Sequence, residues 1–210
     1  MDFDYFLSLN SKMEEMRLGG LESQFKMVPK ERKMINVESI KDPKKAAVLA
    51  LFYPDQFNLT HFLLILRASY DGTHAAQIGF PGGKFEENDG NLKITALRET
   101  TEEVGIPMEK IKMIRKITDT YIPPSNFMVS PYLGLSHDIP RFKTNHEVEE
   151  IIEVPLQDLL NENSVSVQNL TTSYMQNVDV PCFHLNDRVV WGATAMMLSE
   201  IKDLIKESLR

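Results

Sequence analysis

Apolar residues form two short continuous runs early in the chain, and turn residues follow each run. The first run, Ala46–Tyr53, is followed by Pro54-Asp55, and the second, His61–Leu66, by Asp71-Gly72. Continuous apolar runs of this length are typical of strands that are buried on both faces of a sheet. We expect two central strands here and predict further strands over Ile111–Ile117, Phe127–Leu135 and Val148–Val154.

Apolar residues at helical spacing predict three longer helices. The first begins near Tyr5 and ends at Gly19-Gly20, and the second, Leu92–Val104, has a glycine just past its end. The third is Gly192–Leu209. A shorter helix, Leu156–Leu160, follows a proline, which is tolerated in a first helical turn.

The predicted strands and helices do not alternate in a regular βαβ order. This pattern indicates an α+β fold with mixed layers of helices and strands, and the length suits one domain. We expect residues 1–43 to form an N-terminal helix and a basic connection packed on the domain, which spans residues 44–210. We interpret the basic residues as a solvated linker, with a phosphate-facing strip as the alternative: Lys26, Lys30, Arg32, Lys33, Lys41, Lys44 and Lys45.

The chain has 210 residues, 23 of them Lys or Arg and 30 Asp or Glu, and a formal net charge of -7. This balance argues against nonspecific nucleic-acid binding, which depends on Lys and Arg. No run approaches the roughly 20 apolar residues of a membrane span, and the N-terminus is acidic where a secretory signal is basic. We therefore expect a cytoplasmic protein without nucleic-acid or membrane partners. The single cysteine, Cys182, has no partner for a disulfide or a cysteine-based metal site.

Three glutamates crowd one face of the second predicted helix. Glu99, Glu102 and Glu103 stand at positions i, i+3 and i+4, after a turn that contains Gly82-Gly83. Unpaired carboxylates repel one another, so the cluster favours hard divalent cations such as Mg²⁺, which bind oxygen ligands. A solvent-exposed acidic face is the alternative for the glutamates alone. Arg98 is placed to brace one carboxylate by a forked hydrogen bond.

These residues resemble the Nudix box, a glycine followed by five residues, a glutamate, seven residues and the pattern REUxEExGU, where U is aliphatic. Two positions depart from it: fourteen residues instead of thirteen separate Gly83 from Arg98, and Thr100 replaces an aliphatic residue. Counting forward from Gly83 puts Asp89 at the first acidic position, whereas counting back from Arg98 puts Gly90 there. The resemblance implies a divalent-metal hydrolase of nucleoside diphosphate derivatives, with a Nudix-like α/β/α sandwich around a mixed central sheet.

The flanking segments are similar to the coenzyme A pyrophosphatase branch of this family. The similarity lies in Leu63–Ala68, in His74–Gly83 with its Phe-Pro-Gly-Gly ending, and in Thr95–Thr100, and it continues at Glu147–Leu156 and Val190–Ala195. Three of the branch's usual residues, a threonine, an arginine and a glycine, are replaced by Ile65, Gly72 and Ala76. The resemblance, which covers roughly residues 45 to 200, implies coenzyme A or acyl-coenzyme A as the substrate, cleaved to 4′-phosphopantetheine, or its acyl form, and 3′,5′-ADP.

The resemblance also implies roles for single residues. We expect Mg²⁺ or Mn²⁺ to be held by Glu99, Glu102 and Glu103. The carbonyl of Gly83 is the expected additional ligand, with that of Gly82 as the alternative. The candidate catalytic residues are Glu99, Glu103 and Glu147, with Arg98 orienting the carboxylates. Glu147 is our candidate for the general base, with Glu150 next. The candidate substrate-binding residues are Arg67, Gln77, Gly82 and Lys84.

Other residues have a structural interpretation that we prefer. We expect His74 to be a loop or packing histidine, because Mg²⁺ prefers oxygen ligands, and Trp191 to be a core anchor before the last helix. Tyr121, Phe127 and Tyr132 flank a Pro-Pro-Ser turn; we expect core packing, with stacking on a base as the alternative.

Two other functions remain open. The first is hydrolysis of another nucleotide-type substrate, namely ADP-ribose, a dinucleotide or a nucleoside triphosphate. The second is a ligand-sensing module without catalysis, which the presence of all three box glutamates disfavours. The negative charge lies at the candidate site, since residues 84–106 hold six acids and three bases and residues 147–153 hold four acids and no base. The sequence leaves the oligomeric state open, a homodimer included.

Overall fold

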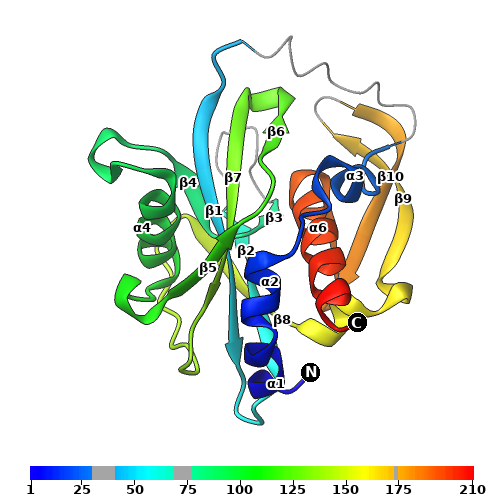
Figure 1. Cartoon of the computed structure of the whole chain (residues 1–210). Coiled ribbons are helices and arrows are strands. Elements are labelled where there is room, and N and C mark those ends of the chain that lie inside the picture. Colours follow the sequence, from blue (N-terminus) through cyan, green and yellow to red (C-terminus); the bar gives the residue numbers. More distant parts are fainter. Residues whose placement is uncertain (30–40, 69–76, 173–174) are drawn as a thin grey trace.

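A mixed β-sheet lies at the centre of the molecule, between two long helices. The computed structural model describes residues 1–29, 41–68, 77–172 and 175–210 (Figure 1). In these residues the sheet has eight strands, five of which run in the order β3-β2-β1-β7-β5, while β4 pairs with β1, β6 with β7 and β8 with β2. The strands are β1 Lys44–Pro54, β2 Thr60–Arg67, β3 Ile78–Gly79, β4 Gly82–Lys84, β5 Lys112–Lys116, β6 Thr120–Ile122, β7 Phe127–Leu135 and β8 Val148–Pro155.

Strands β1 and β7 are parallel and the other pairs are antiparallel, so the sheet is mixed. Both faces of β1 are buried. Ala46, Ala50 and Phe52 join the core on one face, and Leu49 and Leu51 join the core on the other. Two buried faces explain why the first two strands appear in the sequence as continuous apolar runs. The five strands that we predicted are confirmed, with ends that shift by one or two residues.

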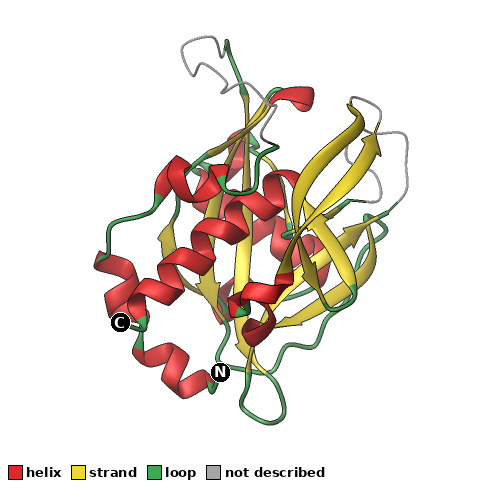
Figure 2. Ribbon diagram, turned by 90° about the vertical axis from the view of Figure 1, so that its right-hand side faces the viewer, coloured by secondary structure: helices red, strands yellow, loops and turns green. Residues whose placement is uncertain are grey.

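Helix α4, Leu92–Val104, covers one face of the sheet, and helix α6, Gly192–Ser208, covers the other (Figure 1). Figure 2 shows the second of these faces, with α6 lying across the strands. Both helices were predicted. Asn91 caps the start of α4 by accepting from the backbone N–H of Ile94 at 3.1 Å, and Gly105, at φ +76°, ends it. The α+β class with a mixed central sheet is therefore confirmed.

The prediction of a single N-terminal helix is wrong. Two short helices, α1 Phe3–Ser8 and α2 Asn10–Glu15, are separated at Leu9, and α3 Gly20–Phe25 begins where we expected the helix to end. The Ser8 hydroxyl donates to the carbonyl of Tyr5, which is the kind of local side-chain bond that competes with a continuous helix. Part of the basic connection, Lys30, Arg32 and Lys33, lies outside the described residues.

Buried hydrogen bonds join α3 to α6. The carboxylate of Glu200 is fully buried and accepts from the amide of Gln24 at 2.9 Å, the hydroxyl of Thr118 at 2.6 Å and the backbone N–H of Gly20 at 3.1 Å. Three donors satisfy this carboxylate without a basic side chain among them. The N-terminal segment thus packs against α6, as Figure 1 shows.

A second, three-stranded sheet, which we did not predict, lies beyond α6 (Figure 1). Its order is β11-β10-β9, with strands β9 Val165–Thr172, β10 Met175–Leu185 and β11 Arg188–Trp191. The remaining short elements are helix α5 Leu156–Leu160, which was predicted, and 3₁₀ turns at Glu87–Asp89, Met108–Lys110, Pro123–Ser125 and Glu162–Ser164. No helix among the described residues is long and apolar enough to cross a bilayer.

Candidate active site

Two adjacent glycines bring strand β4 close to β1 on one side and to α4 on the other. Gly82 has φ +152°, and a Cβ there would lie 2.3 Å from the carbonyl oxygen of Ala47. A Cβ on Gly83 would lie 2.3 Å from Oε1 of Glu99. Only glycine allows both approaches. The Gly-Gly turn therefore sets the carboxylate of Glu99 directly against the backbone of β4.

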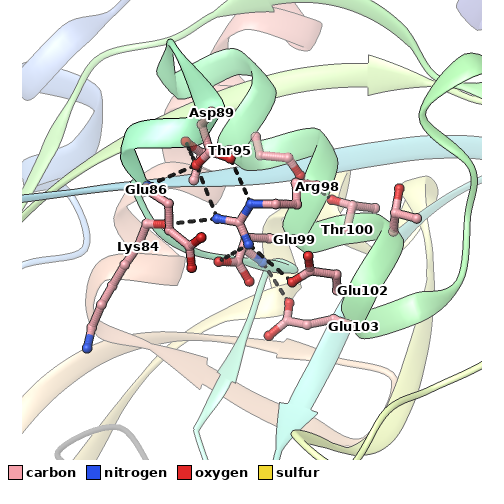
Figure 3. A network of polar contacts seen from close by, with 12 residues as sticks. Lys84, Glu86, Asp89, Thr95, Arg98, Glu99, Thr100, Glu102 and Glu103 are labelled. Carbon is pink, nitrogen blue, oxygen red and sulfur yellow. Dashed lines mark hydrogen bonds and ion pairs between the residues drawn. The ribbon is translucent and has the colours of Figure 1, made fainter.

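Arg98 lies at the centre of the polar network in Figure 3. Its guanidinium makes a forked contact with Asp89, Nε to Oδ1 at 2.7 Å and Nη2 to Oδ2 at 3.1 Å. Its Nη1 lies 3.0 Å from Glu99 and 3.1 Å from Glu102, and its Nη2 donates to the carbonyl of Lys84 at 3.1 Å. The forked bond that we expected on one box glutamate is thus made to Asp89 instead. Arg98 holds α4, β4 and the turn between them together.

Asp89 is buried and its carboxylate is fully used by neighbours in the chain. Besides Arg98, it accepts from the hydroxyl of Thr95 at 2.8 Å and from the backbone N–H of Glu86 at 3.0 Å. The hydrogen bond from Arg98 is the main reason why the pKa of Asp89 lies well below its ordinary value. Asp89 therefore braces Arg98. Thr100, which replaces an aliphatic residue, is also buried and donates its hydroxyl to the carbonyl of Ala96 at 2.7 Å.

Glu103 is the most deeply buried carboxylate of the box, with 1% of its side chain exposed. One of its oxygens lies 3.1 Å from Nη1 of Arg67, and the other accepts from the backbone N–H of Gly82 at 2.7 Å. Burial raises the pKa of Glu103 to about 7, against the opposing effects of Arg67 and Gly82, and the nearby charges of Glu99 and Glu147 raise it further. Burial is also the main reason why the pKa of Glu99 is raised. Bringing these carboxylates together therefore disfavours their charged forms, a penalty that a bound cation relieves.

Glu147 approaches the box from the second acidic segment. Its Oε2 lies 3.7 Å from Nη2 of Arg67, and its side chain is 43% exposed. Glu150, our second candidate for the base, instead pairs with Arg188 of β11 at 2.7 Å. The structure thus brings Glu147, but not Glu150, next to the box glutamates.

The oxygen donors of the box suit a hard divalent cation, because Mg²⁺ and Mn²⁺ favour carboxylate and carbonyl ligands. In the part of the chain that the structure describes, however, no three acidic, histidine or cysteine side chains already converge as a metal cluster. Arg98 and Arg67 take up the carboxylates of Glu99, Glu102 and Glu103. The side chain of Glu102 is 53% exposed. The absence of a side chain at Gly83 leaves room for the carboxylate of Glu99. This set of oxygen donors fits a hard cation, which would share these carboxylates with the two arginines.

A cavity of about 560 Å³ opens beside the box on the α6 face of the sheet. The candidate substrate-binding residues Arg67, Gln77, Gly82 and Lys84 all line it, so the structure brings them together. In Figure 3 the side chain of Lys84 points away from the box glutamates. The apolar part of the lining comes from several elements: Ala46, Val48, Ile78, Phe80, Ile122, Pro124, Phe127, Val129, Val189, Trp191, Ala193 and Met197.

Several lining residues were missed or misjudged from the sequence. Trp191 precedes α6 as expected, but it lines the cavity and is only partly buried, so its assignment to the core is wrong. Phe127 lines the cavity too, whereas the hydroxyl of Tyr121 donates to Asn126 at 2.9 Å. Lys44 was placed in the basic connection, yet it opens β1 and lines the cavity, with Nζ 5.6 Å from the ring centroid of Phe127. His74 lies outside the described residues.

The family of the chain follows from comparison with known proteins. The model of the NUDIX domain matches residues 43–172. The chain belongs to the Nudix family. As a Nudix hydrolase it is an enzyme that acts on pyrophosphate bonds of nucleotide-derived compounds, and Nudix hydrolases generally use divalent metals.

Relatives of this Nudix hydrolase include an uncharacterized Nudix hydrolase, NudL, of Yersinia pestis (strain Pestoides F). The two are 32% identical over 149 residues, which cover 66% of this chain and 69% of the relative. Among solved structures, a MutT/nudix family protein from Enterococcus faecalis has a TM-score of 0.52 at 14% identity. The match covers 84% of this chain and 66% of the Enterococcus chain. The MutT protein from Methanosarcina mazei Go1 has a TM-score of 0.50 at 18% identity. This match covers 81% of this chain and 99% of the Methanosarcina chain. These two structures share the fold.

Proposed function

We propose that this Nudix hydrolase cleaves the pyrophosphate linkage of coenzyme A or acyl-coenzyme A. Water adds to one phosphorus and the bridging oxygen leaves with the other, which gives 4′-phosphopantetheine, or its acyl form, and 3′,5′-ADP. The proposal rests on the resemblance of residues 45 to 200 to the coenzyme A pyrophosphatase branch and on the cavity next to the box.

The observation that carries the proposal is the position of the cavity. The box glutamates lie on the α4 face of the sheet, and the cavity lies on the α6 face. Gly82, Gly83 and Arg67 contact or adjoin the box and also line the cavity, so the two faces meet there. A pyrophosphate at this junction has acidic residues on one side and an apolar space on the other. Coenzyme A carries its pyrophosphate between two bulky parts, and a cavity of about 560 Å³ is within the usual size range for ligand pockets.

In this proposal Glu99, Glu102, Glu103 and the carbonyl of Gly83 hold Mg²⁺ or Mn²⁺. When bound there, the cation would supply positive charge for the phosphate oxygens and would make an attacking water more acidic. Arg98 is the proposed positioning residue, because it joins Glu99 and Glu102 to Asp89 and is not among the residues that line the cavity.

Glu147 is the proposed general base, since it is partly exposed beside the box and remains close to the cavity residue Arg67. The guanidinium of Arg67 and the ammonium of Lys84 are the proposed donors to phosphate oxygens. Gln77 and the Gly82 backbone contribute polar groups to the same wall of the cavity.

Product analysis by mass spectrometry tests the proposal. The purified protein is incubated with coenzyme A, acetyl-coenzyme A, ADP-ribose, a dinucleotide and a nucleoside triphosphate, each with Mg²⁺, with Mn²⁺ and with a chelator. We expect metal-dependent release of 4′-phosphopantetheine and 3′,5′-ADP from coenzyme A. Cleavage of ADP-ribose with coenzyme A left intact would assign the other nucleotide-type substrate. The absence of any product with either metal would favour a ligand-sensing module.

A further inference from the structure

Arg67 lies between two carboxylates that come from different parts of the chain. Its Nη1 is 3.1 Å from Oε1 of Glu103 on α4, and its Nη2 is 3.7 Å from Oε2 of Glu147, the residue before β8. Its Nη1 is also 3.4 Å from the carbonyl of Gly82. The same side chain lines the cavity. Arg67 therefore contacts both the acidic box and the space that the substrate is proposed to enter.

A β-bulge places Arg67 in this position. The pairing of β2 with β8 shifts register between Leu66 and Arg67, so that Leu66 faces Glu150 while Arg67 faces Val148. The backbone N–H of Ala68 then donates to the carbonyl of Glu147 at 2.9 Å. Bulges re-aim side chains at the ends of strand pairs. Here the bulge holds the backbones of Arg67 and Glu147 side by side at the edge of the box.

Both oxygens of the Glu103 carboxylate already have a partner in the chain. One oxygen faces Arg67 and the other faces the N–H of Gly82, and the side chain is 1% exposed. The Gly82 N–H is fixed in the backbone of β4, whereas the long side chain of Arg67 has the cavity beside it. Arg67 is thus the partner that is able to leave.

We propose that Arg67 is an exchangeable counter-ion of the box. Without a divalent cation, its guanidinium neutralises Glu103 and Glu147. When a divalent cation binds at Glu103, the guanidinium turns into the cavity and becomes the donor to the substrate's pyrophosphate. This inference rests on the proposed function and adds a coupling to it: metal loading exposes the group that recognises the phosphate.

Binding of Mn²⁺ alone, measured by the electron paramagnetic resonance signal of free Mn²⁺ without any nucleotide, tests the coupling. Arg67→Ala and Arg67→Gln remove the charge that competes with the cation, so both variants should bind Mn²⁺ about tenfold more tightly than the wild type. Arg67→Lys keeps a positive charge and should stay near the wild type. Arg188→Ala, an exposed arginine paired with Glu150, is the matched control and should not change.

The same variants separate this role from two simpler ones. With a substrate that the wild type cleaves, Arg67→Gln should raise KM about tenfold while Mn²⁺ binding becomes tighter. Unchanged Mn²⁺ affinity in Arg67→Gln would overturn the inference in favour of a contact with substrate only. Weaker Mn²⁺ binding would overturn it in favour of a structural brace. A wild type that binds no Mn²⁺ would instead overturn the proposed metal site itself.

Thermal unfolding gives a second readout that needs no activity. Without metal, Arg67→Gln leaves the buried Glu103 without its basic partner, so its Tm should fall below that of the wild type. Saturating Mn²⁺ should raise the Tm of Arg67→Gln by more than it raises that of the wild type. An equal increase in both proteins would contradict the exchange.

Discussion

The carboxylate of Glu99 fills the space that a side chain on Gly83 would need. A Cβ at Gly83 would lie 2.3 to 2.6 Å from the three carboxylate atoms of Glu99 and would force this side chain to move. The contact joins strand β4, which lines the cavity, to helix α4, which carries the box. A glycine is therefore required here by the position of the Glu99 carboxylate.

Gly83→Ala should displace Glu99 and lower turnover by at least about tenfold, while stability changes little, because the clash is with the end of a flexible side chain. Gly82→Ala should behave differently, because its Cβ would meet backbone atoms of Ala47 and Val48 and its φ is +152°. We expect Gly82→Ala to lose about 3 kcal/mol of unfolding free energy. Gly79→Ala, whose Cβ would make an ordinary contact of 3.5 Å with Thr194, is the control. Urea unfolding and kcat are measured on all three variants. A Gly83→Ala variant that matched Gly79→Ala in both stability and kcat would contradict this account.

Glu102→Gln and Glu103→Gln should each remove most turnover, by about 100-fold or more, because each removes a proposed ligand of the cation. Folding should be preserved. In Glu103→Gln the buried charge disappears, so its Tm in the presence of a chelator should be equal to or above that of the wild type. Glu109→Gln, an exposed glutamate just after α4, is the control. Turnover near the wild-type value in both box variants at saturating Mg²⁺ would disprove the metal assignment.

Asp89→Asn should remove the forked bond with Arg98 and lower the unfolding free energy by about 3 kcal/mol at pH 7. The pKa of Asp89 is lowered in the folded protein, so its contribution is present above the ordinary value of 3.8 and is lost as the pH falls below it. The difference in stability between wild type and Asp89→Asn should therefore shrink between pH 7 and pH 3. Urea unfolding at both pH values measures it. A difference that stayed constant, or grew toward pH 3, would show that Asp89 does not act as a charged partner.

Lys44→Ala should weaken the preference for substrates that carry an additional phosphate on the part that enters the cavity. Lys44 lines the cavity next to Phe127, whereas its neighbour Lys45 does not line it. Under the proposed function, KM for coenzyme A should rise about tenfold in Lys44→Ala, and KM for dephospho-coenzyme A should stay near the wild-type value. Lys45→Ala is the matched control. Equal changes for the two substrates would argue against this role.

The central part of the fold was predictable because each signal was local. The apolar runs of β1 and β2 reflect burial on two faces, and α4 has its cap and its terminal glycine next to it in the sequence. The N-terminal helix was predicted as one piece because its apolar spacing continues across Leu9, where the structure divides it into α1 and α2. The second sheet was missed because polar residues interrupt its strands, although Asn186 and Asp187, both at positive φ, form the tight turn that was its signal.

The candidate site was predictable only in part. The spacing of Glu99, Glu102 and Glu103 on one helix identifies the box, because those residues are neighbours in sequence and in space. The place of Asp89 was ambiguous by counting, and the structure resolves it through the bond with Arg98. Arg67 and Glu147 are 80 residues apart in the chain, and their contact depends on strand register and on a bulge. Local sequence patterns do not contain this relationship.

A competition experiment shows which substrate this Nudix hydrolase prefers. Equimolar coenzyme A and ADP-ribose are mixed with the wild-type protein and Mg²⁺ in one reaction, and the loss of each is followed by mass spectrometry, which gives the ratio of the two kcat/KM values. We expect coenzyme A to be consumed first, with 4′-phosphopantetheine and 3′,5′-ADP formed in equal amounts, and no reaction with Glu103→Gln. Loss of ADP-ribose while coenzyme A stays intact would contradict the account.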